Sequence, residues 1–336
     1  MTRLGIIGAG RIGRVHAESI SRMAQATVKT IADPFLTEEA QAWAKQLGVG
    51  NCIKDYKAIL ADPEIDGVLI CSSTDTHAPI SLEAIAAGKH VFCEKPVSQD
   101  LGEIFKVKEA LAAKPVKYQV GFNRRFDHNF RAARAAVEAG KVGEQHTVRI
   151  TSRDPAPPPI SYIKPSGGMF MDMTIHDFDM LRYITASEVD EVFVRAGVMV
   201  DPAIGQAGDV DTAVITLTMK NGAIAIIENS RQALYGYDQR IEVFGSLGMV
   251  GTGNDTLSTA VISNKDGVSS EKPLYFFLER YMDAFVQEMR EFVEAINSDT
   301  PVPVGIEDGL QSVLVAMACN LSLKENRAVK MTEVGK

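Results

Sequence analysis

The chain has 336 residues, enough for two domains, and 46% of them are hydrophobic, as is ordinary for a globular protein in water. Its formal net charge of −8 argues against a nucleic-acid partner, because there is no basic excess to neutralise phosphates. We expect no membrane span, since no apolar run reaches roughly 18 residues, and no signal peptide, since the first residues lack the order of a charged segment followed by an apolar one. The four cysteines show neither disulfide nor metal-ligand spacing, so we expect a reduced, cytoplasmic setting and no metal.

Apolar runs and amphipathic segments alternate from residue 4 to residue 120. The predicted strands are residues 4–7, 27–32, 67–71, 90–93 and 118–120, with another beginning at residue 53. The predicted helices are residues 14–23, 38–47, 57–61 and 78–87. Such alternation is typical of right-handed βαβ units that build an open, doubly wound parallel sheet.

A glycine-rich turn, Gly8-Ala9-Gly10-Arg11-Ile12-Gly13, joins the first predicted strand to the first predicted helix. Gly8 permits a tight turn, Gly10 lets the backbone approach a pyrophosphate, and Gly13 lets helix and strand pack closely. The second strand ends in Asp33, where a carboxylate would hydrogen-bond the ribose hydroxyls of a dinucleotide. A plain turn with a capping aspartate is the simpler alternative, but the joint match favours a Rossmann dinucleotide site.

Asp33 also indicates which dinucleotide is bound. A carboxylate at this position repels a 2′-phosphate, and the following residues, Pro34-Phe35-Leu36, offer no cation to receive one. The sequence therefore predicts NAD rather than NADP.

Two further segments are expected at the carboxyl ends of the parallel strands, where open α/β sheets bind ligands. One is the loop 72–77, and the other is Glu94-Lys95-Pro96. Because Pro96 fixes the local backbone, we expect Lys95 to point toward the nicotinamide and to hold a substrate hydroxyl oxygen with its ammonium group. Taken alone, the tripeptide is equally compatible with a surface lysine at a strand end.

The pattern changes after the segment 121–127, and we place the domain boundary between residues 122 and 123. The second domain, 123–336, is predicted to be α+β with a large, mostly antiparallel, open-faced sheet. Its predicted strands are residues 145–152, 191–200, 211–219, 223–230, 239–245, 249–250 and 259–263, and its helices are 129–139, 280–297 and 305–324. The proline-rich segment 155–159 is predicted to be a stiff wall, a lid or a connector.

One predicted helix, residues 169–182, is apolar on most sides but carries a polar stripe. Asp172, His176 and Asp179 recur at helical spacing, with Tyr183 one turn further on. A buried charge is costly without a partner, so we expect this stripe to line a cavity, with Asp172 and His176 facing a ligand. Histidine exchanges its proton near neutral pH, which suits a general base. The alternative is a core histidine satisfied by Asp172.

A turn between predicted strands, Tyr235-Gly236-Tyr237-Asp238, is expected to reach the substrate or a neighbouring subunit, although a plain surface loop is at least as compatible with it. Tyr281 is a comparable case. The open face of the predicted sheet is available to a partner subunit.

Three motifs together resemble the glucose–fructose oxidoreductase/inositol dehydrogenase family. They are the glycine-rich turn 8–13, the string Ala87-Gly88-Lys89-His90-Val91-Phe92-Cys93-Glu94-Lys95-Pro96, and Asp172 with His176. The glycine pattern is shared with many dinucleotide enzymes, whereas the 87–96 string is specific. Within the family, the segments 121–127, 153–155 and 171–177 resemble the members that oxidise inositol.

The resemblance implies NAD-dependent oxidation of myo-inositol at C2 to 2-keto-myo-inositol in inositol catabolism, usually by a homotetramer. It implies a catalytic set of Lys95, Asp172 and His176. The implied cofactor contacts are Gly8, Gly10, Arg11, Ile12, Gly13, Asp33, Ser72, Thr74, His77, Glu94 and Lys95. The implied contacts to further substrate hydroxyls are Asn123, Arg125, Asp154 and Tyr235. A cyclic polyol suits such a pocket, because each hydroxyl both donates and accepts a hydrogen bond.

The sequence is also compatible with two other functions. One is a scyllo-inositol or sugar dehydrogenase with the same machinery and another preferred ring. The other is a sensor that binds NAD without turnover. Retention of Lys95, Asp172 and His176 together argues against a sensor, which has no need of a proton acceptor.

Overall fold

The computed structural model describes residues 1–335 and divides the chain into two compact units. The first unit contains residues 1–126 and 282–313, and the second contains residues 127–281 together with the chain from residue 314 onward. The prediction places every residue after 122 in the second domain, whereas the structure groups the segment 282–313 with the first unit. Its side chains Met289, Phe292 and Val293 are buried in the core of the first unit, which explains the grouping.

A six-stranded parallel sheet forms the centre of the first unit, in the order β3-β2-β1-β4-β5-β6. This doubly wound order confirms the predicted Rossmann domain. The strands are β1 Thr2–Ile7, β2 Ala26–Ala32, β3 Asn51–Ile53, β4 Gly67–Ile70, β5 His90–Glu94 and β6 Tyr118–Gly121. The helices are α1 Arg11–Ser21, α2 Glu38–Gln46, α3 Lys57–Ala61, α4 Thr74–Ala86 and α5 Leu101–Ala112, followed by the 3-10 turn η1 Asn123–Phe126.

Two helices of this unit differ from the sequence prediction. Helix α4 begins at Thr74 rather than residue 78, so the predicted loop 72–77 is mostly the first turn of a helix. Helix α5 was not predicted at all. The side chain of Asp100 caps it by accepting a hydrogen bond from the backbone N–H of Glu103 at 3.1 Å.

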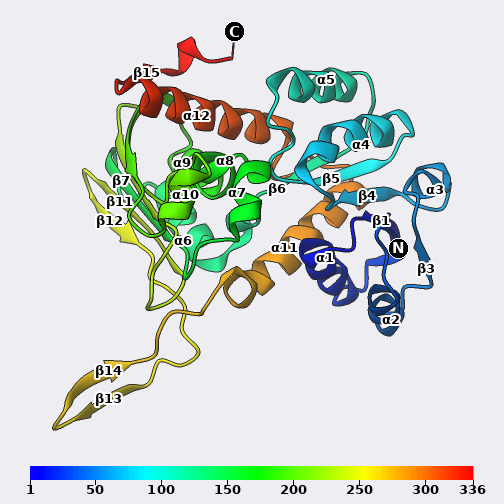
Figure 1. The fold of residues 1–336 in the computed structure, drawn as a ribbon, viewed down its shortest axis with the longest axis horizontal. Coiled ribbons are helices and arrows are strands. Elements are labelled where there is room, and N and C mark those ends of the chain that lie inside the picture. Colours follow the sequence, from blue (N-terminus) through cyan, green and yellow to red (C-terminus); the bar gives the residue numbers. More distant parts are fainter. Residues whose placement is uncertain (336) are drawn as a thin grey trace. The chain divides into compact units, whose positions relative to one another are not determined.

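The second unit contains a mixed seven-stranded sheet in the order β12-β11-β7-β10-β9-β8-β15. Only β7 and β10 pair in parallel, so the expectation of a mostly antiparallel sheet is confirmed. Its strands are β7 Gln145–Arg153, β8 Val189–Gly197, β9 Thr212–Met219, β10 Ile224–Ser230, β11 Asp238–Gly245, β12 Gly248–Gly251 and β15 Val329–Lys330. A separate hairpin, β13 Val261–Asn264 with β14 Gly267–Ser270, projects away from this sheet (Figure 1).

Helices cover one face of the mixed sheet. They include α6 His128–Glu138, α7 Ile160–Ser166, α8 Gly168–Asp172, α9 Ile175–Thr185 and α10 Pro202–Gln206. Helices α11 Phe277–Asn297 and α12 Ile306–Glu325 each span a boundary between the units, and the 3-10 turn η2 Met331–Glu333 follows β15. Within residues 1–335, no helix combines the length and the apolar character that crossing a membrane requires.

Side chains along the strands of the mixed sheet alternate between a buried and an exposed face. In β9, Ala213, Ile215, Leu217 and Met219 are buried, as expected for one face against a core. The opposite face leaves large apolar side chains in solvent, and they include Val214, Ile224, Phe244 and Met249. The predicted open-faced sheet is therefore present, with apolar residues on its open side.

Candidate active site

The glycine-rich turn leaves space where a dinucleotide would approach. Gly8 has a φ of 106°, and a Cβ atom there would lie 2.6 Å from the carbonyl oxygen of Cys71. A Cβ at Gly13 would lie 2.0 Å from the carbonyl oxygen of Gly8, whereas a Cβ at Gly10 would meet nothing within 4 Å. Gly8 and Gly13 thus permit the tight turn and the close packing of α1. The backbone at Gly10 is open to a pyrophosphate, and the positive end of the α1 helix dipole suits that anion.

The side chain of Asp33, at the end of β2, is hydrogen-bonded to this turn. Its Oδ2 atom accepts a hydrogen bond from the backbone N–H of Ala9 at 2.7 Å, and its Oδ1 atom accepts one from Phe35 at 2.8 Å. Each carboxylate oxygen has two acceptor positions, so capacity for ribose hydroxyls is left. The residues present therefore fit NAD, whose binding to Asp33 stays a prediction.

His77, in the first turn of α4, joins the ends of two neighbouring strands. Its side chain is buried, with Nδ1 2.8 Å from the carbonyl oxygen of Pro96 and Nε2 3.1 Å from that of Ser72. Carbonyl oxygens only accept, so only the protonated ring donates to both. Burial acts to lower the pKa of His77, but Cys93 and the two carbonyl hydrogen bonds outweigh it and raise the pKa to about 9. His77 thus ties the chain after β4 to the chain after β5.

Glu94 is held by a histidine that sequence reasoning missed. The Nε2 atom of His16, a fully buried residue of α1, lies 2.6 Å from Oε1 of Glu94. Nδ1 of His16 is buried without a hydrogen-bond partner among residues 1–335, so the tautomer protonated at Nε2 best fits both groups. The half-buried Lys95 therefore lies between two anchored neighbours, Glu94 and Pro96, and its peptide bond to Pro96 is cis.

The predicted helix 169–182 is interrupted. Asp172 is the last residue of α8, and His176 is the second residue of α9, so the predicted continuous stripe is wrong. The backbone N–H of Thr174 donates to the carbonyl oxygen of Met169 at 3.0 Å, five residues back, and its hydroxyl donates to the side chain of Asn229 at 2.7 Å. The same hydroxyl lies 3.3 Å from the carbonyl oxygen of Met169, and a threonine hydroxyl that bonds a nearby backbone carbonyl competes with helix geometry. Asn229 also donates to Asp177 at 2.8 Å.

The carboxylate of Asp172 is bound by an arginine that sequence reasoning also missed. The Nη1 atom of Arg231 lies 3.0 Å from Oδ2 of Asp172 and 3.6 Å from Oδ2 of Asp154. The hydroxyl of Tyr162 donates to Oδ1 of Asp172 at 3.3 Å. The structure thus brings Asp154 and Asp172, two predicted site residues, onto one guanidinium group. His176 is half-buried in the next helix.

The other predicted substrate contacts are engaged in local interactions. Asn123 and Arg125 are buried in η1, and Nη2 of Arg125 donates to Asp308 at 2.8 Å. The hydroxyl of Tyr235 donates to Asp238 at 2.6 Å and accepts a hydrogen bond from Arg153 at 2.7 Å. Burial and the bond to Asp238 raise the pKa of Tyr235. No sequence motif predicts that Arg125 pairs with Asp308 or that Tyr235 bonds to Arg153.

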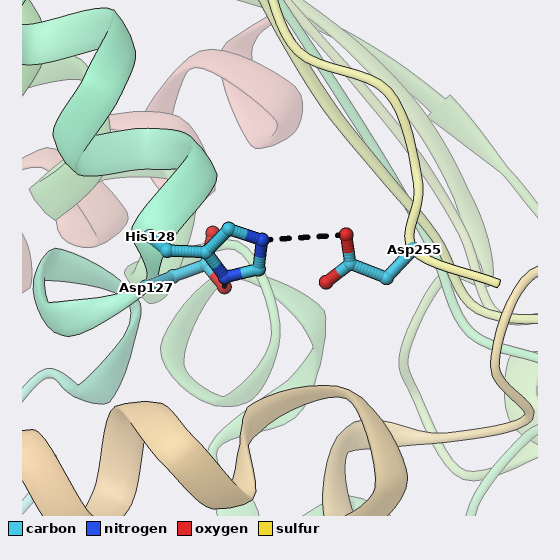
Figure 2. A group of neighbouring side chains, drawn as sticks. All are labelled: Asp127, His128 and Asp255. Carbon is cyan, nitrogen blue, oxygen red and sulfur yellow. Dashed lines mark ion pairs between the residues drawn. The ribbon is translucent and has the colours of Figure 1, made fainter. Parts of the chain in front are cut away.

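Asp127, His128 and Asp255 form a group whose ligand atoms lie within 4.8 Å of one another (Figure 2). Nε2 of His128 faces Oδ1 of Asp255 at 3.5 Å. However, the guanidinium group of Arg280 contacts both carboxylates, at 3.0 Å from Oδ1 of Asp127 and 2.8 Å from Oδ2 of Asp255. Asp127 also caps α6 through the backbone N–H groups of residues 129 and 130. Arg280 therefore already supplies the positive charge that these carboxylates need.

The predicted residues fall into the two units as follows. The cofactor residues, with Lys95, Asn123 and Arg125, belong to the first unit, whereas Asp154, Asp172, His176 and Tyr235 belong to the second. The fold and these residues together define an NAD-binding oxidoreductase with a Rossmann domain. The chain belongs to the GFO/IDH/MocA family, because a model for an oxidoreductase family with an NAD-binding Rossmann fold matches residues 2–122 and the GFO/IDH/MocA C-terminal domain matches residues 130–251.

Individual relatives cover the whole chain. The myo-inositol 2-dehydrogenase of Thermotoga maritima is 48% identical over 332 residues, 99% of both chains. A crystal structure of a myo-inositol dehydrogenase from Corynebacterium glutamicum is 37% identical and superposes with a TM-score of 0.93, covering 98% of each chain. The scyllo-inositol dehydrogenase of Lactobacillus casei, solved with NAD(H) and scyllo-inositol, is 31% identical with a TM-score of 0.91 and covers 99% of each chain.

Proposed function

We infer that this protein oxidises myo-inositol at C2 with NAD, giving 2-keto-myo-inositol and NADH. The observation that carries the proposal is the full-length similarity, at 48% identity, to a myo-inositol 2-dehydrogenase. The fold adds support, because its open glycine turn and Asp33 fit NAD and the pair Asp154 and Asp172 offers acceptors for a polyol.

Three side chains carry the chemistry in this proposal. His176 takes the proton of the C2 hydroxyl, since imidazole is a good base near neutral pH. Asp172 orients that hydroxyl, and the ammonium group of Lys95 bonds the reacting oxygen and stabilises the negative charge that develops on it. Bound NAD supplies the hydride acceptor. Lys95 belongs to the first unit, and Asp172 and His176 belong to the second.

The remaining residues hold the two ligands. The cofactor is bound by the glycine turn 8–13, Asp33, the segment after β4 with Ser72, Thr74 and His77, and Glu94. His77 and Glu94 act here through the strand ends that they anchor. Asn123, Arg125, Asp154 and Tyr235 contact further hydroxyls. A buried hydrogen-bonding group left without its partner costs about 1–3 kcal/mol, which lets such a pocket distinguish axial from equatorial hydroxyls.

A second candidate is a dehydrogenase that prefers scyllo-inositol. The observation that favours it is the 31% identity to a scyllo-inositol dehydrogenase over nearly the whole chain. The higher identity to the myo-inositol enzyme places it second. A non-catalytic sensor is disfavoured, because Lys95, Asp172 and His176 are all present.

The proposal extends to assembly and setting. A homotetramer is supported by the apolar side chains on the open face of the mixed sheet. A reducing compartment such as the cytoplasm is supported by the four cysteines, which are all free thiols.

The direct test measures NADH formation with NAD or NADP and a panel of myo-inositol, scyllo-inositol and glucose. We expect the highest kcat/KM with myo-inositol and NAD. A clear preference for scyllo-inositol or glucose would select the second candidate. NAD binding without turnover of any polyol would select the sensor, and a preference for NADP would contradict the role given to Asp33.

A further inference from the structure

Arg231 is among the largest fully buried side chains of the protein, at 2% exposure. It directly follows β10, and Asp154 directly follows β7, the parallel neighbour of β10. Ser230 is in register with Arg153, so Arg231 and Asp154 leave the sheet side by side. The backbone N–H of Asp154 donates to the carbonyl oxygen of Ser230 at 2.9 Å, and that of Arg231 donates to Asp211 at 2.8 Å. The main chain on both sides of this pair is therefore fixed.

Only one of the three nitrogen atoms of the Arg231 guanidinium group contacts the two carboxylates. Its Nη1 atom makes the hydrogen bond to Asp172 at 3.0 Å and the ion pair with Asp154 at 3.6 Å. Its Nε and Nη2 atoms are buried and have no hydrogen-bond partner among residues 1–335. Burying a guanidinium group with two unused donors costs stability, and apolar residues of similar size would pack at lower cost. Arg231 is thus poorly explained as a residue that only supports folding.

Two carboxylates converge on this one cation. Asp154 and Asp172 are both nearly buried, with 13% and 14% of their side chains exposed. Two such groups close together repel each other, and the positive guanidinium group beside them offsets that repulsion. A carboxylate offers about four acceptor positions, so besides Arg231 and, for Asp172, the hydroxyl of Tyr162, the pair can accept hydrogen bonds from two neighbouring hydroxyls.

We propose that Arg231 is a positioning residue that sets Asp172 and Asp154 as one acceptor pair for two adjacent hydroxyls of the polyol. This inference rests on the proposed function. Asp172 accepts a hydrogen bond from the hydroxyl next to the reacting one, because the single hydrogen of the reacting hydroxyl goes to His176, and Asp154 accepts one from the hydroxyl beyond it. The orientation of the reacting carbon relative to His176 then depends on Arg231, although Arg231 itself does not act on the reacting atoms.

The test compares Arg231→Met with Arg231→Lys in the full-length enzyme. We expect Arg231→Met to lower kcat by about 10- to 100-fold, as when one charge-assisted hydrogen bond in an active site is lost. We expect Arg231→Lys, which keeps the charge, to recover part of that loss. With substrate deuterated at C2, the kinetic isotope effect on kcat should increase in Arg231→Met, because a misaligned hydride transfer becomes rate-limiting.

A matched control is Arg280→Met. Arg280 is likewise buried between two carboxylates, those of Asp127 and Asp255, in the same unit. Its loss should lower the melting temperature and leave the isotope effect unchanged. A loss of folded enzyme would reduce the active fraction in either variant, but it would not alter the isotope effect of the molecules that remain folded.

A double-mutant comparison identifies the route of action. If Arg231 works through Asp172, Arg231→Met should have little further effect on kcat in an Asp172→Asn background. A wild-type kcat and isotope effect in Arg231→Met would overturn the inference, and so would an undiminished effect in the Asp172→Asn background. Both results require an active wild-type enzyme. An inactive wild type would instead overturn the proposed function and, with it, the role of Arg231 in polyol binding.

Discussion

At the scale of single residues, the proton acceptor is the most exacting part of the proposal. His176 sits near the start of α9, where its backbone N–H donates to the carbonyl oxygen of Met173 at 3.3 Å. Because alanine favours a helix, replacing His176 by alanine should leave α9 intact. We expect His176→Ala to lower kcat by about 10²–10⁴-fold, the usual worth of a general base, with little change in melting temperature. Steady-state kinetics and thermal unfolding measure the two effects.

His128→Ala is the matched control for that substitution. His128 belongs to the same unit and its side chain is 67% exposed, so its ion pairs with acidic neighbours contribute little. Its removal should leave kcat within a factor of about two. Turnover at the wild-type rate in His176→Ala would remove the imidazole from the mechanism.

Replacing Lys95 is expected to lower turnover much more than it lowers the affinity for NAD. Its neighbours Glu94 and Pro96 are held by His16 and His77, so replacing the side chain leaves the local backbone in place. A hydrogen bond from a charged group is worth about 1.5–3 kcal/mol, and we expect Lys95→Met to lower kcat about 10- to 100-fold. NAD affinity, measured by calorimetry, should change much less. An equal loss of NAD affinity and turnover would mean that Lys95 serves the cofactor instead.

The sequence revealed site residues that belong to motifs and missed those that only support them. Gly8 and Gly13, and the step from Lys95 to Pro96, belong to short motifs that are recognised from neighbouring residues in the sequence. Arg231 and His16 have none, because their partners lie 59 and 78 residues away along the chain. A buried charge is recognised from the residue that neutralises it, and that pairing is a property of the fold.

At the scale of secondary-structure elements, His77 links the segments after β4 and β5, and this link should depend on pH. The pKa of His77 rises from its ordinary value of 6.5 to about 9 in the folded protein. The stabilisation is therefore complete below about pH 6.5 and is lost as the pH rises through about 9. We expect His77→Gln to lower the melting temperature most at the acidic end of this window, with the difference from wild type shrinking toward the alkaline end.

His90 provides a control of opposite sign. It begins β5 in the same unit, and burial lowers its pKa, with a further contribution from Lys117. Its folded state therefore resists protonation, and wild-type stability should fall as the pH drops below about 6.5. His90→Gln should reduce that acid sensitivity. If the melting temperature of His77→Gln ran parallel to wild type at every pH, the charged link would be excluded.

Element type was well predicted where a local pattern sufficed. The alternation of apolar runs gave the parallel strands, and Lys220-Asn221-Gly222 marked the hairpin between β9 and β10. The break between α8 and α9 could not be predicted, because it depends on the hydroxyl of Thr174 bonding to Asn229, 55 residues further on. The short helices α7 and α10 also lack a long enough periodic pattern.

At the scale of the whole molecule, the open face of the mixed sheet leads to the last prediction. Val214, Ile224, Phe244 and Met249 expose apolar side chains on four strands of one sheet. A face of this kind is typical of a subunit interface, and a charge introduced there must be buried without a partner if the subunits associate. We expect Ile224→Asp, at 54% exposure, to shift the proposed homotetramer to smaller species. Light scattering after size-exclusion chromatography measures the mass.

Phe105→Asp distinguishes an interface from a general effect of surface charge. Phe105 is 43% exposed but lies on α5, in the unit without the mixed sheet. Removing an exposed aromatic there should leave the mass unchanged, because no other large apolar side chain of α5 is exposed with it. The two outcomes together are decisive, since a tetramer that survives Ile224→Asp would require an interface elsewhere. A wild-type chain that runs as a monomer would leave the apolar face without the role proposed for it.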